Sequence, residues 1–326
     1  MPDMIRSSSP QVEAHHDSVL VSEALEALAL TPNDIVVDAT LGGAGHFSKM
    51  LAMLGTGGVI VGIDADAEAV ERARTVYALD RRHERPTAHI VNDNFRNLTR
   101  ILERLGIGQI DAILFDLGWS GYQIAAPRGF SFQGSEPLLM TYGESGETAA
   151  DIVNSASEEE LAGIIHTYGE ERFARGIARA IVAARAHERI LTTDALVAAI
   201  KAGTPSWYHG QKNHPATKTF QALRIAANDE LGSLREGLAA ALQALAPGGR
   251  IAIISFHSIE DRAVKHALRE AAENGGGTVS KKPLIPSRAE ILANRRARSA
   301  KLRVFERAAS TPLAEAVPSD GFVYST

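Results

Sequence analysis

Acidic and polar residues stand directly after apolar, strand-like runs at three points of the sequence. Asp64 and Asp116 each end such a run. The apolar run 251–254 stops abruptly in a polar cluster that begins with Ser255 and His257. Carboxylate and imidazole groups in such positions can accept a proton, orient a substrate or bind the hydroxyl groups of a ligand. The three run ends are therefore the first candidates for a functional site.

The polar cluster also has a simpler structural interpretation. Ser258 followed three residues later by Asp261 is typical of a capping box at the start of a helix. We expect Ser258 and Asp261 to cap the helix, while Ser255 and His257 are free to contact a substrate. His257 is expected to be neutral, because the positive end of a helix dipole disfavours a cation.

A glycine-rich loop precedes the first of the two acids. The stretch "DATLGGAGH" (38–46) follows a strand-like run and precedes a helical one, and its glycines permit a tight turn and close approach of a ligand. Asp64, 22 residues after Gly42, stands where an acid can bind a ribose diol. The loop is not a G-x-G-x-x-G, so NAD and S-adenosyl-L-methionine both fit it. A glycine turn beside a solvated acid is the structural alternative.

Composition limits the classes of protein. The 326 residues are 45% hydrophobic and 22% charged, which is ordinary globular usage for about two domains or one domain with a large insertion. The net charge of −5 restricts any nucleic-acid surface to a local patch. The absence of cysteine excludes disulfides, thiol catalysis and cysteine zinc sites. No apolar run spans a bilayer and the start lacks a signal peptide, so we expect a cytoplasmic protein without membrane contact.

The elements that position these residues alternate along the chain. Strand-like runs at 35–46, 58–66, 88–95 and 112–120 are separated by helical stretches, which predicts a parallel, doubly wound α/β sheet. Ligands bind beyond the carboxyl ends of such strands. Residues 147–202 have a helical pattern, and 214–245 is expected to be one long helix. The final segments 278–287 and 300–307 are expected to form an antiparallel pair.

These patterns predict an α/β domain interrupted by an all-helical insertion. The expected division is a flexible N-terminus at 1–14, an α/β domain at 15–124 and 223–310, an inserted helical domain for substrate recognition at 125–222, and a C-terminal tail at 311–326.

The order of the elements distinguishes between the two cofactors. A dehydrogenase needs a His or Tyr constellation that handles hydride, and none is evident. The fourth strand ends at Asp116, the fifth ends in the polar cluster, and a basic hairpin closes the chain. Seven-stranded methyltransferases follow this plan, with the tip of the fourth strand meeting the methyl acceptor. The sequence thus favours S-adenosyl-L-methionine over NAD.

Eight motifs of the chain resemble, in the same order, those of the bacterial RsmH (MraW) family. They are "HDSVLVSEAL", "DATLGGAGH", "DLGWSGYQ", "RGFSF", "YGEERFARGIARAIV", "HPATKTFQALRIAANDEL", "GGRIAIISFHSIEDR" and "RSAKLRV", and they run from about His16 to Arg307. The resemblance implies a class I (Rossmann-like) methyltransferase with a seven-stranded sheet and an inserted all-helical domain. It also implies methylation of the N4 amine of a specific cytidine in the decoding region of 16S rRNA, within the small ribosomal subunit. A homodimer is one expected state.

The resemblance assigns the site residues. The cofactor-binding residues that it implies are Ala44, Gly45, His46, Asp64, Phe95, Asp116 and Gln123. Phe95 is expected near the adenine, and Asp116 and Gln123 at the methionine end. We expect Asp116, His257 and Ser255 to be catalytic, with Asp116 as proton acceptor and the other two at the substrate base. No metal is expected.

The chain departs from the family pattern near the acceptor site. After "RGFSF" the family has Pro-Leu-Asp-Met-Arg, whereas this chain has Leu139 and Thr141 in place of the acid and the base. The family's Ser-Ser after "DLG" is altered to Ser120 and Gly121. If the absent acid and base form an ion pair in the family, losing both is nearly neutral. If either contacts RNA, this protein uses another group.

Two alternatives to an RNA methyltransferase have to be considered. A DNA-base or protein-amide methyltransferase is disfavoured, because DNA amino-methyltransferases carry an Asn/Asp-Pro-Pro-Tyr/Phe motif where this chain has "DLGW" (116–119). A non-catalytic RNA-binding ribosome-assembly factor that keeps the methyltransferase fold is supported by the changes at Leu139 and Thr141. The intact cofactor loop argues against it.

Two segments are candidates for RNA contact. Nine Lys and Arg residues gather between Lys281 and Arg307, against Glu290 and Glu306, and form a local basic stripe that can neutralise phosphates. The stretch "SWYHGQKNHPATK" (206–218) mixes aromatic and basic residues, as base-stacking surfaces do. A solvated charged face is the structural alternative for the stripe.

Overall fold

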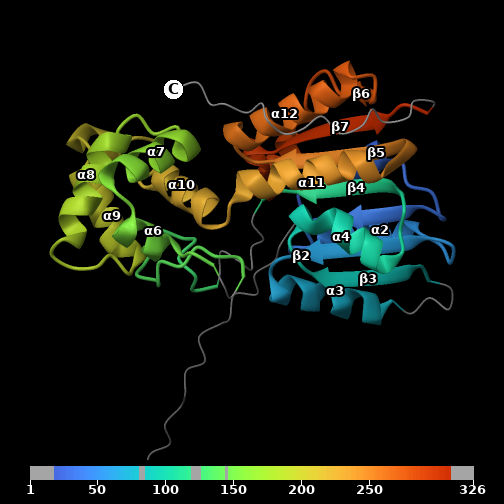
Figure 1. Cartoon of the computed structure of the whole chain (residues 1–326), viewed down its shortest axis with the longest axis horizontal. Helices are drawn as coiled ribbons and strands as arrows, with labels where there is room; N and C mark the ends of the chain where they lie inside the picture. Colours follow the sequence, from blue (N-terminus) through green and yellow to red (C-terminus); the bar gives the residue numbers. More distant parts are fainter. Residues whose placement is uncertain (1–17, 81–84, 119–125, 144–145, 310–326) are drawn as a thin grey trace, which may run out of the picture.

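The computed structural model describes residues 18–80, 85–118, 126–143 and 146–309. They form two bodies that lie side by side (Figure 1). The α/β body (residues 18–118 and 229–309, apart from 81–84) contains the sheet, and the helical body (residues 126–227, apart from 144–145) contains helices packed on one another. The chain leaves the sheet after its fourth strand and returns to it before the fifth.

Within the described residues, seven strands form one sheet in the order β3-β2-β1-β4-β5-β7-β6. The strands are β1 (Ile35–Asp38), β2 (Val59–Asp64), β3 (Thr87–Asn92), β4 (Ile110–Asp116), β5 (Leu245–Ser255), β6 (Gly277–Val279) and β7 (Lys301–Arg307). β1 to β5 are parallel, and β7 is antiparallel to both β5 and β6. The predicted parallel sheet and its closing antiparallel pair are confirmed.

The strands are apolar because both faces of the sheet are covered. Successive residues point to opposite faces, so Val36 belongs to one hydrophobic cluster and Val37 to the other. Three helices cover the first face: α1 (Val21–Leu28), α2 (Gly45–Met53) and α3 (Ala67–Leu79). Three others cover the second face: α4 (Leu98–Leu105), α11 (Glu230–Ala244) and α12 (Ser258–Glu273).

Short helices complete the α/β body. η1 (Phe95–Asn97) precedes α4, and α13 (Arg288–Ala293) and η3 (Arg295–Ser299) lie between the last two strands. Ala297 and Ala300 are buried in the same cluster as α1, and the amide of Leu20 donates to Glu290. The segment with α13 and η3 is therefore fixed against the first helix.

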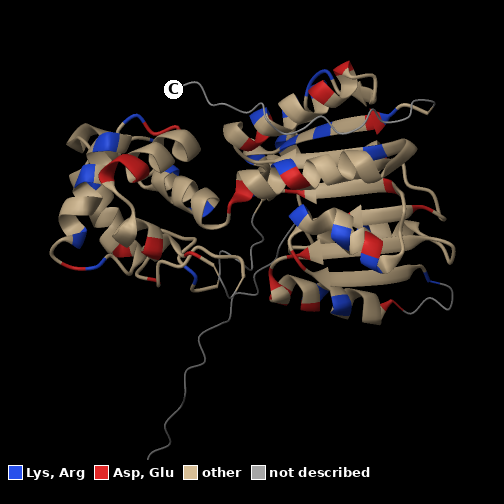
Figure 2. Ribbon diagram, in the orientation of Figure 1, with Lys and Arg blue, Asp and Glu red and all other residues tan. Residues whose placement is uncertain are grey.

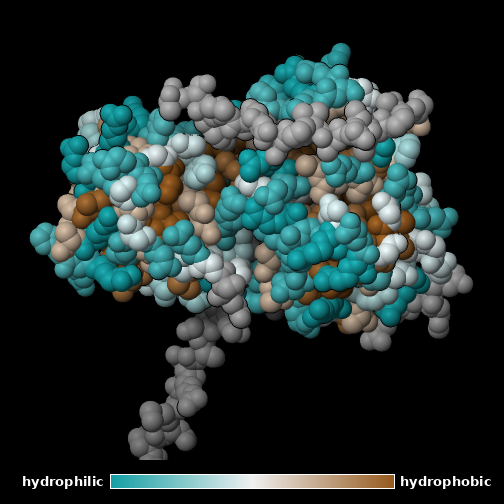
Figure 3. All heavy atoms as spheres, viewed as in Figure 1, coloured by the Kyte–Doolittle hydropathy of each residue, from teal (hydrophilic) through white to brown (hydrophobic). Residues whose placement is uncertain are grey.

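The helical body is built around a third hydrophobic cluster. Its helices are α6 (Ala149–Ser155), α7 (Glu158–Gly169), α8 (Ala174–Arg185), α9 (Thr193–Ala202), η2 (Ser206–Gly210) and α10 (Thr217–Ala227). Thr148 and Ser157 begin α6 and α7 with capping boxes, in which each hydroxyl accepts from an otherwise unpaired amide. No helix in the described part of the chain is long and apolar enough to cross a membrane. Hydrophilic residues cover most of the face shown in Figure 3, with hydrophobic patches among them.

The prediction of one long helix over 214–245 is wrong. The segment forms α10 and α11, which are separated at Asp229, whose φ of 44° is left-handed. The Asn228 amide group holds the break: it donates to the carbonyl of Met140 at 2.6 Å and accepts from the amide of Tyr142 at 2.9 Å. Helical periodicity continues through the break, so the pattern alone did not reveal it.

The break also bears on the expected boundary after residue 222. Phe220 and Leu223 of α10 are buried in the cluster of the helical body, whereas Leu234 and Leu238 of α11 pack on the sheet. We therefore propose that the helical domain ends at the break around Asp229.

Candidate active site

A cavity opens at the carboxyl ends of the parallel strands, where the two bodies meet. One side, which we call the strand-end wall, includes Thr40, Gly42, His46, Asp64, Phe95 and Asp116. The opposite side, the junction wall, includes Tyr142, Asn228, Glu230, Phe256, Glu260 and Arg296. The cavity has the position expected for the ligand site of an open α/β sheet.

The glycine loop forms part of the strand-end wall. Gly42 and Ala44 have left-handed φ angles of 48° and 60°, and α2 begins at Gly45. A side chain at Gly45 would overlap the hydroxyl of Ser18, so a larger residue there would require Ser18 to move. Ala44 is buried and, like Gly45, lies behind Gly42 and His46 rather than at the cavity surface.

Asp64 is held by the loop that it faces. Its carboxylate accepts from the amide of Gly42 at 2.8 Å and from the amide of Asp66 at 2.9 Å. Burial raises the pKa of Asp64 to about 6, although these two amides favour the charged form. The carboxylate is thus fixed at the tip of β2 with its remaining lone pairs toward the cavity that it lines.

Phe95 provides an apolar part of the same wall. Its ring packs edge-on against Phe115 of β4, with ring centroids 5.5 Å apart, and a side chain at Gly237 would overlap it. Asn94 begins η1 by accepting from the amide of Arg96 and so fixes the backbone at Phe95. The ring is therefore rigidly placed beside the acids.

Three ionisable groups lie together behind the tips of β1 and β4. The Nδ1 atom of His46 is 3.4 Å from Oδ2 of Asp116, and its Nε2 atom is 3.0 Å from the carbonyl oxygen of Val19. Although burial lowers the pKa of His46, its hydrogen bond with Asp116 and the charges of Asp116 and Asp38 raise that pKa overall. Asp38 is fully buried, which raises its pKa to about 7 despite the attraction of His46.

Two carboxylate oxygens of this group are unpaired. Oδ2 of Asp38 and Oδ1 of Asp116 are buried without a hydrogen-bond partner among the described residues. A buried carboxylate oxygen without a partner is costly, and Asp116 lines the cavity, so a positively charged ligand group could pair with it there. Asp38 does not line the cavity and lies behind it. Sequence reasoning missed Asp38, although its position at the end of the first strand was a signal.

The polar cluster after β5 is arranged differently from the prediction. α12 is capped by His257, whose Nδ1 accepts from the amide of Glu260 at 3.3 Å, while Glu260 accepts from the amides of Phe256 and His257. The predicted capping by Ser258 and Asp261 is wrong. A capping box places its acid three residues after the cap, and both His257 with Glu260 and Ser258 with Asp261 satisfy that spacing.

Ser258 and Asp261, which do not cap α12, make contacts with distant parts of the chain instead. Ser258 donates to Glu170 of the helical body at 2.7 Å, and Arg262 donates to the same carboxylate at 2.6 Å. Asp261 accepts from Lys301 at 2.9 Å and from Arg303 at 2.7 Å. These contacts fix α12 to the helical body on one side and to β7 on the other.

Of the remaining predicted residues near β5, Ser255 is 2% exposed and, like His257, is not among the residues that line the cavity. Phe256 and Glu260, which sequence reasoning did not assign to the site, do line it. Gln123 lies outside the described residues.

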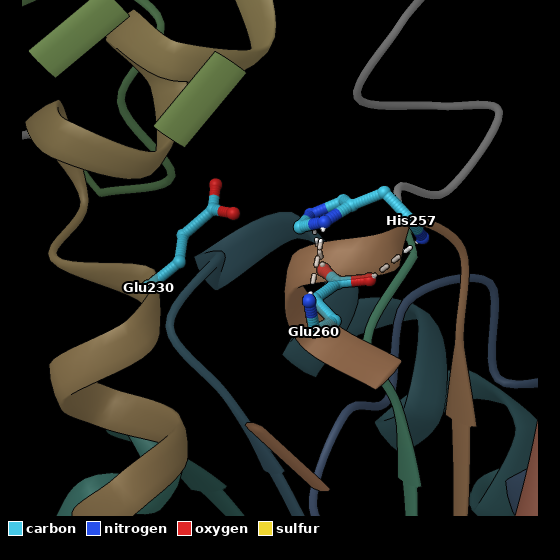
Figure 4. A group of neighbouring side chains, drawn as sticks. All are labelled: Glu230, His257 and Glu260. Atoms are coloured by element: carbon cyan, nitrogen blue, oxygen red, sulfur yellow. Dashed lines mark hydrogen bonds and ion pairs between the residues drawn. The ribbon is translucent and has the colours of Figure 1, made fainter. Parts of the chain in front are cut away.

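Glu230, His257 and Glu260 meet at the junction wall (Figure 4). Their ligand-type atoms lie within 4.8 Å of one another, a spacing that a metal ion can bridge. However, the Nε2 atom of His257 is 3.0 Å from Glu260, and the guanidinium group of Arg224 is 2.6 Å from Glu230. An arginine cation thus already balances this cluster, and we assign no metal to it.

Tyr142 follows the segment in which the acid and base of the family pattern are missing. Leu139 is exposed and Thr141 half-buried. The hydroxyl of Tyr142 donates to Glu230 at 2.8 Å, and Glu230 also accepts from Arg224. Burial and the charge of Glu230 raise the pKa of Tyr142 well above its usual value. Tyr142 thereby connects the altered segment to the start of α11.

The basic stripe is only partly available to a ligand. Arg303 and Lys301 pair with Asp261, and the buried Arg307 donates to the carbonyl of Leu245. The six exposed members are Lys281, Lys282, Arg288, Arg295, Arg296 and Arg298. Figure 2 shows Lys and Arg mixed with Asp and Glu over both bodies. Arg296 also lines the cavity, so the exposed part of the stripe reaches its mouth.

The aromatic stretch 206–218 lies in the helical body. Trp207 is 56% exposed, and the guanidinium group of Arg172 lies 4.8 Å from the centre of its ring. Tyr208 is anchored beneath it by donating to the buried Glu171 at 2.6 Å. Lys218 donates to the carbonyl of Glu170.

Comparison with known proteins gives a consistent result. A family model described as "MraW methylase family" matches residues 13–308. A protein of Deinococcus radiodurans is 47% identical over 310 residues, which are 95% of each chain. One from Deinococcus deserti is 47% identical over 90% of this chain and 93% of its own, and one from Syntrophotalea carbinolica is 44% identical over 90% and 98%. All three are named "Ribosomal RNA small subunit methyltransferase H".

Proposed function

Because this chain belongs to the MraW methylase family, we propose that it methylates the N4 amine of a specific cytidine in 16S rRNA, with S-adenosyl-L-methionine as methyl donor. The observation that carries the proposal is the unpaired oxygen of Asp116 at the tip of the fourth strand, in a cavity built for a cationic ligand. The relatives' names support the ribosomal substrate, and the cytidine and its N4 atom are our inference.

The strand-end wall fits the proposed cofactor. S-adenosyl-L-methionine carries positive charge on its sulfonium and its ammonium group, and the carboxylates of Asp64 and Asp116 line this wall. Asp64, fixed at the tip of β2, would accept from the ribose hydroxyls, and the Phe95 ring would contact the adenine. The backbone of the glycine loop at Gly42, which lines the cavity, would approach the methionine part closely, because glycine has no side chain to prevent it. The contacts predicted for Ala44 and Gly45 stay a prediction.

The chemistry requires a positioned proton acceptor. Cytosine's amine is a weak nucleophile, because its lone pair is delocalised into the ring. When bound, the cofactor supplies a methyl group on a positively charged sulfur. Transfer of this methyl group to the amine nitrogen, with release of the neutral thioether, would require the nitrogen to give up one proton. Oδ1 of Asp116 would accept the N–H of the amine and take that proton.

His46 would position Asp116 for this role. Its imidazole lies between Oδ2 of Asp116 and the carbonyl of Val19, and the raised pKa favours a protonated ring that donates to both. His46 would thereby fix the orientation of the Asp116 carboxylate, and Asp116 lines the cavity. Ser255 and His257 would act from behind Phe256 by fixing the backbone that carries it.

The remaining proposals concern RNA binding, location in the cell and oligomeric state. The exposed cations at the cavity mouth would bind phosphates of the RNA, whose unstacked base must reach the pocket. Since the proposed substrate is 16S rRNA in the small ribosomal subunit, we infer that the protein acts in the cytoplasm. A homodimer stays a prediction, which sedimentation analysis of the purified chain tests.

Mass analysis of RNase digests of 16S rRNA tests the function. Small subunits from a strain that lacks the gene would be incubated with the purified protein and isotopically labelled S-adenosyl-L-methionine. We expect one labelled N4-methylcytidine. Label on another atom or base would refute the assignment of the acceptor. RNA binding without any label would favour the assembly-factor alternative.

A further inference from the structure

The cavity extends past the strand-end wall to the junction wall. Asp116 and Phe256 line the same cavity, and so does Arg296. The junction wall is therefore the part of the cavity whose groups could hold a second molecule beside the cofactor.

Most polar atoms of the junction wall are already engaged. Both oxygens of Glu230 bind Arg224, and one also accepts from Tyr142. Asn228 uses its carbonyl oxygen and its amide nitrogen to hold the break between the two helices. Glu260 accepts from the amides of Phe256 and His257 and from the imidazole. These residues hold the two bodies together and are poorly suited to bind a substrate.

Two groups of the junction wall are different. The ring of Phe256 lies against Gly118, two residues after Asp116, and a side chain at Gly118 would overlap it. Its backbone amide donates to Glu260 at 2.9 Å, so the ring has a fixed base. Phe256 is only partly buried, and it lines the cavity. It is therefore a flat apolar surface beside the proposed proton acceptor.

Arg296 is the other available group. It is exposed, and its guanidinium group forms no hydrogen bond or ion pair within the described ranges, whereas its backbone amide donates to Asn294 at 3.1 Å. The next residue, Ala297, is buried in the hydrophobic cluster of the α1 face. A free cation on a fixed backbone at the cavity mouth suits a phosphate group.

We propose that Phe256 and Arg296 form the subsite for the target nucleotide. The cytosine ring stacks on Phe256 with its amine toward Asp116, and the adjoining phosphate binds Arg296. An aromatic surface, an unpaired carboxylate and a free guanidinium group match the base face, the amine and the phosphate of one unstacked nucleotide. This inference rests on the proposed function and deepens it by assigning the residues that hold the base.

Paired substitutions at each position test the subsite by methylation of small ribosomal subunits under single-turnover conditions. Phe256→Tyr keeps an aromatic ring and Phe256→Leu keeps the apolar bulk without it. We expect Phe256→Tyr to stay within about threefold of wild type and Phe256→Leu to lose about tenfold to a hundredfold in kcat/KM, the range of base–aromatic stacking. Arg296→Ala should lose about tenfold, and Arg295→Ala, an exposed neighbour outside the cavity, much less.

Thermal unfolding and calorimetric titration with S-adenosyl-L-methionine accompany each variant. Unchanged cofactor affinity and melting temperature would separate damage to the subsite from damage to the fold. The proposal is overturned if Phe256→Leu matches Phe256→Tyr, or if Arg296→Ala matches Arg295→Ala. Failure of the proposed function is distinct, because the wild type itself would then yield no labelled N4-methylcytidine.

Discussion

The two walls of the cavity differ in how their polar atoms are used. At the strand-end wall, Asp116 keeps a buried oxygen without a partner among the described residues, and Asp38 keeps another directly behind the wall. At the junction wall, Glu230 and Glu260 are saturated by Arg224, Tyr142, His257 and backbone amides. Both walls are acidic, so charge alone does not identify a ligand site. Incomplete pairing does, because burial of an unpaired charge is tolerated where a ligand supplies the partner.

The largest expected effect comes from removing the charge of the proposed proton acceptor, Asp116. Asp116→Asn should lower the single-turnover methylation rate at saturating cofactor and RNA by about two to four orders of magnitude, the range for a positioned proton acceptor. His257→Ala should lose less, because His257 caps a helix and does not line the cavity. Circular dichroism would verify both folds. A near-normal rate for Asp116→Asn would assign the chemistry to another group.

At the junction wall, the corresponding substitution should damage stability. Arg224→Met leaves Glu230 buried without its cation and should cost about 3–5 kcal/mol in free energy of unfolding, measured with urea. Arg224→Met combined with Glu230→Leu should recover most of this loss. Arg262→Met, which breaks the exposed pair with Glu170, should cost about 0–1 kcal/mol. Equal losses for Arg224→Met and Arg262→Met would contradict the comparison.

The pH dependence of the free energy of unfolding should show the cost of burying the charged carboxylate of Asp38. The pKa of Asp38 rises from 3.8 to about 7 on folding, so the folded state binds the proton more tightly. The stabilisation that this proton gives the folded state is fully present below pH 3.8 and is lost as the pH rises to about 7. Between pH 4.5 and pH 8, the free energy of unfolding of the wild type without cofactor should fall by about 1–4 kcal/mol more than that of Asp38→Asn. Parallel curves for the two proteins in urea titrations would rule this out.

A smaller effect is expected at the proposed ribose contact. Asp64→Ala should weaken S-adenosyl-L-methionine binding by about 1.5–3 kcal/mol, the range for hydrogen bonds to a charged group, as measured by calorimetric titration. Asp93 also follows a strand but pairs with Arg100 and does not line the cavity. Asp93→Ala should therefore bind the cofactor like wild type. Wild-type affinity in Asp64→Ala would refute the assignment.

The smallest effect concerns the cavity mouth. Reversing the charge of Arg295 and Arg296 should weaken RNA binding and reduce the slope of log affinity against log salt by about one unit, for the phosphate that Arg296 no longer neutralises. Cofactor affinity should not change. An unaltered slope in filter-binding titrations would mean that this part of the stripe is only a solvated face.

Much of the strand-end wall was predictable because its residues follow local patterns. The apolar runs, the glycine loop and the acids at 64 and 116 predict a parallel sheet and the edge at which a ligand binds, since strands buried on both faces are apolar throughout. The ordered motifs added the family and its cofactor. Asp38 obeyed the same pattern, but no local signal shows that one of its oxygens lacks a partner.

The junction wall was predicted poorly, because its contacts join distant segments. The choice between His257 and Ser258 as the cap of α12 depended on Glu170, 88 residues away, which binds Ser258. The break between α10 and α11 depended on carbonyl and amide groups near Met140. In the basic stripe, pairing with Asp261 engaged Arg303 and Lys301, while Arg296 stayed free of partners among the described residues at the cavity mouth.

The sequence by itself thus determined the sheet, the glycine loop and the edge where the acids gather, because each depends on side-chain type at a fixed local spacing. Only the tertiary structure decided which of those acids keep an unpaired oxygen and which Lys and Arg side chains form ion pairs within the protein. The physical reason is that the cost of a buried charge depends on its partners, and partners such as Arg224 for Glu230 or Arg303 for Asp261 are brought together only by packing.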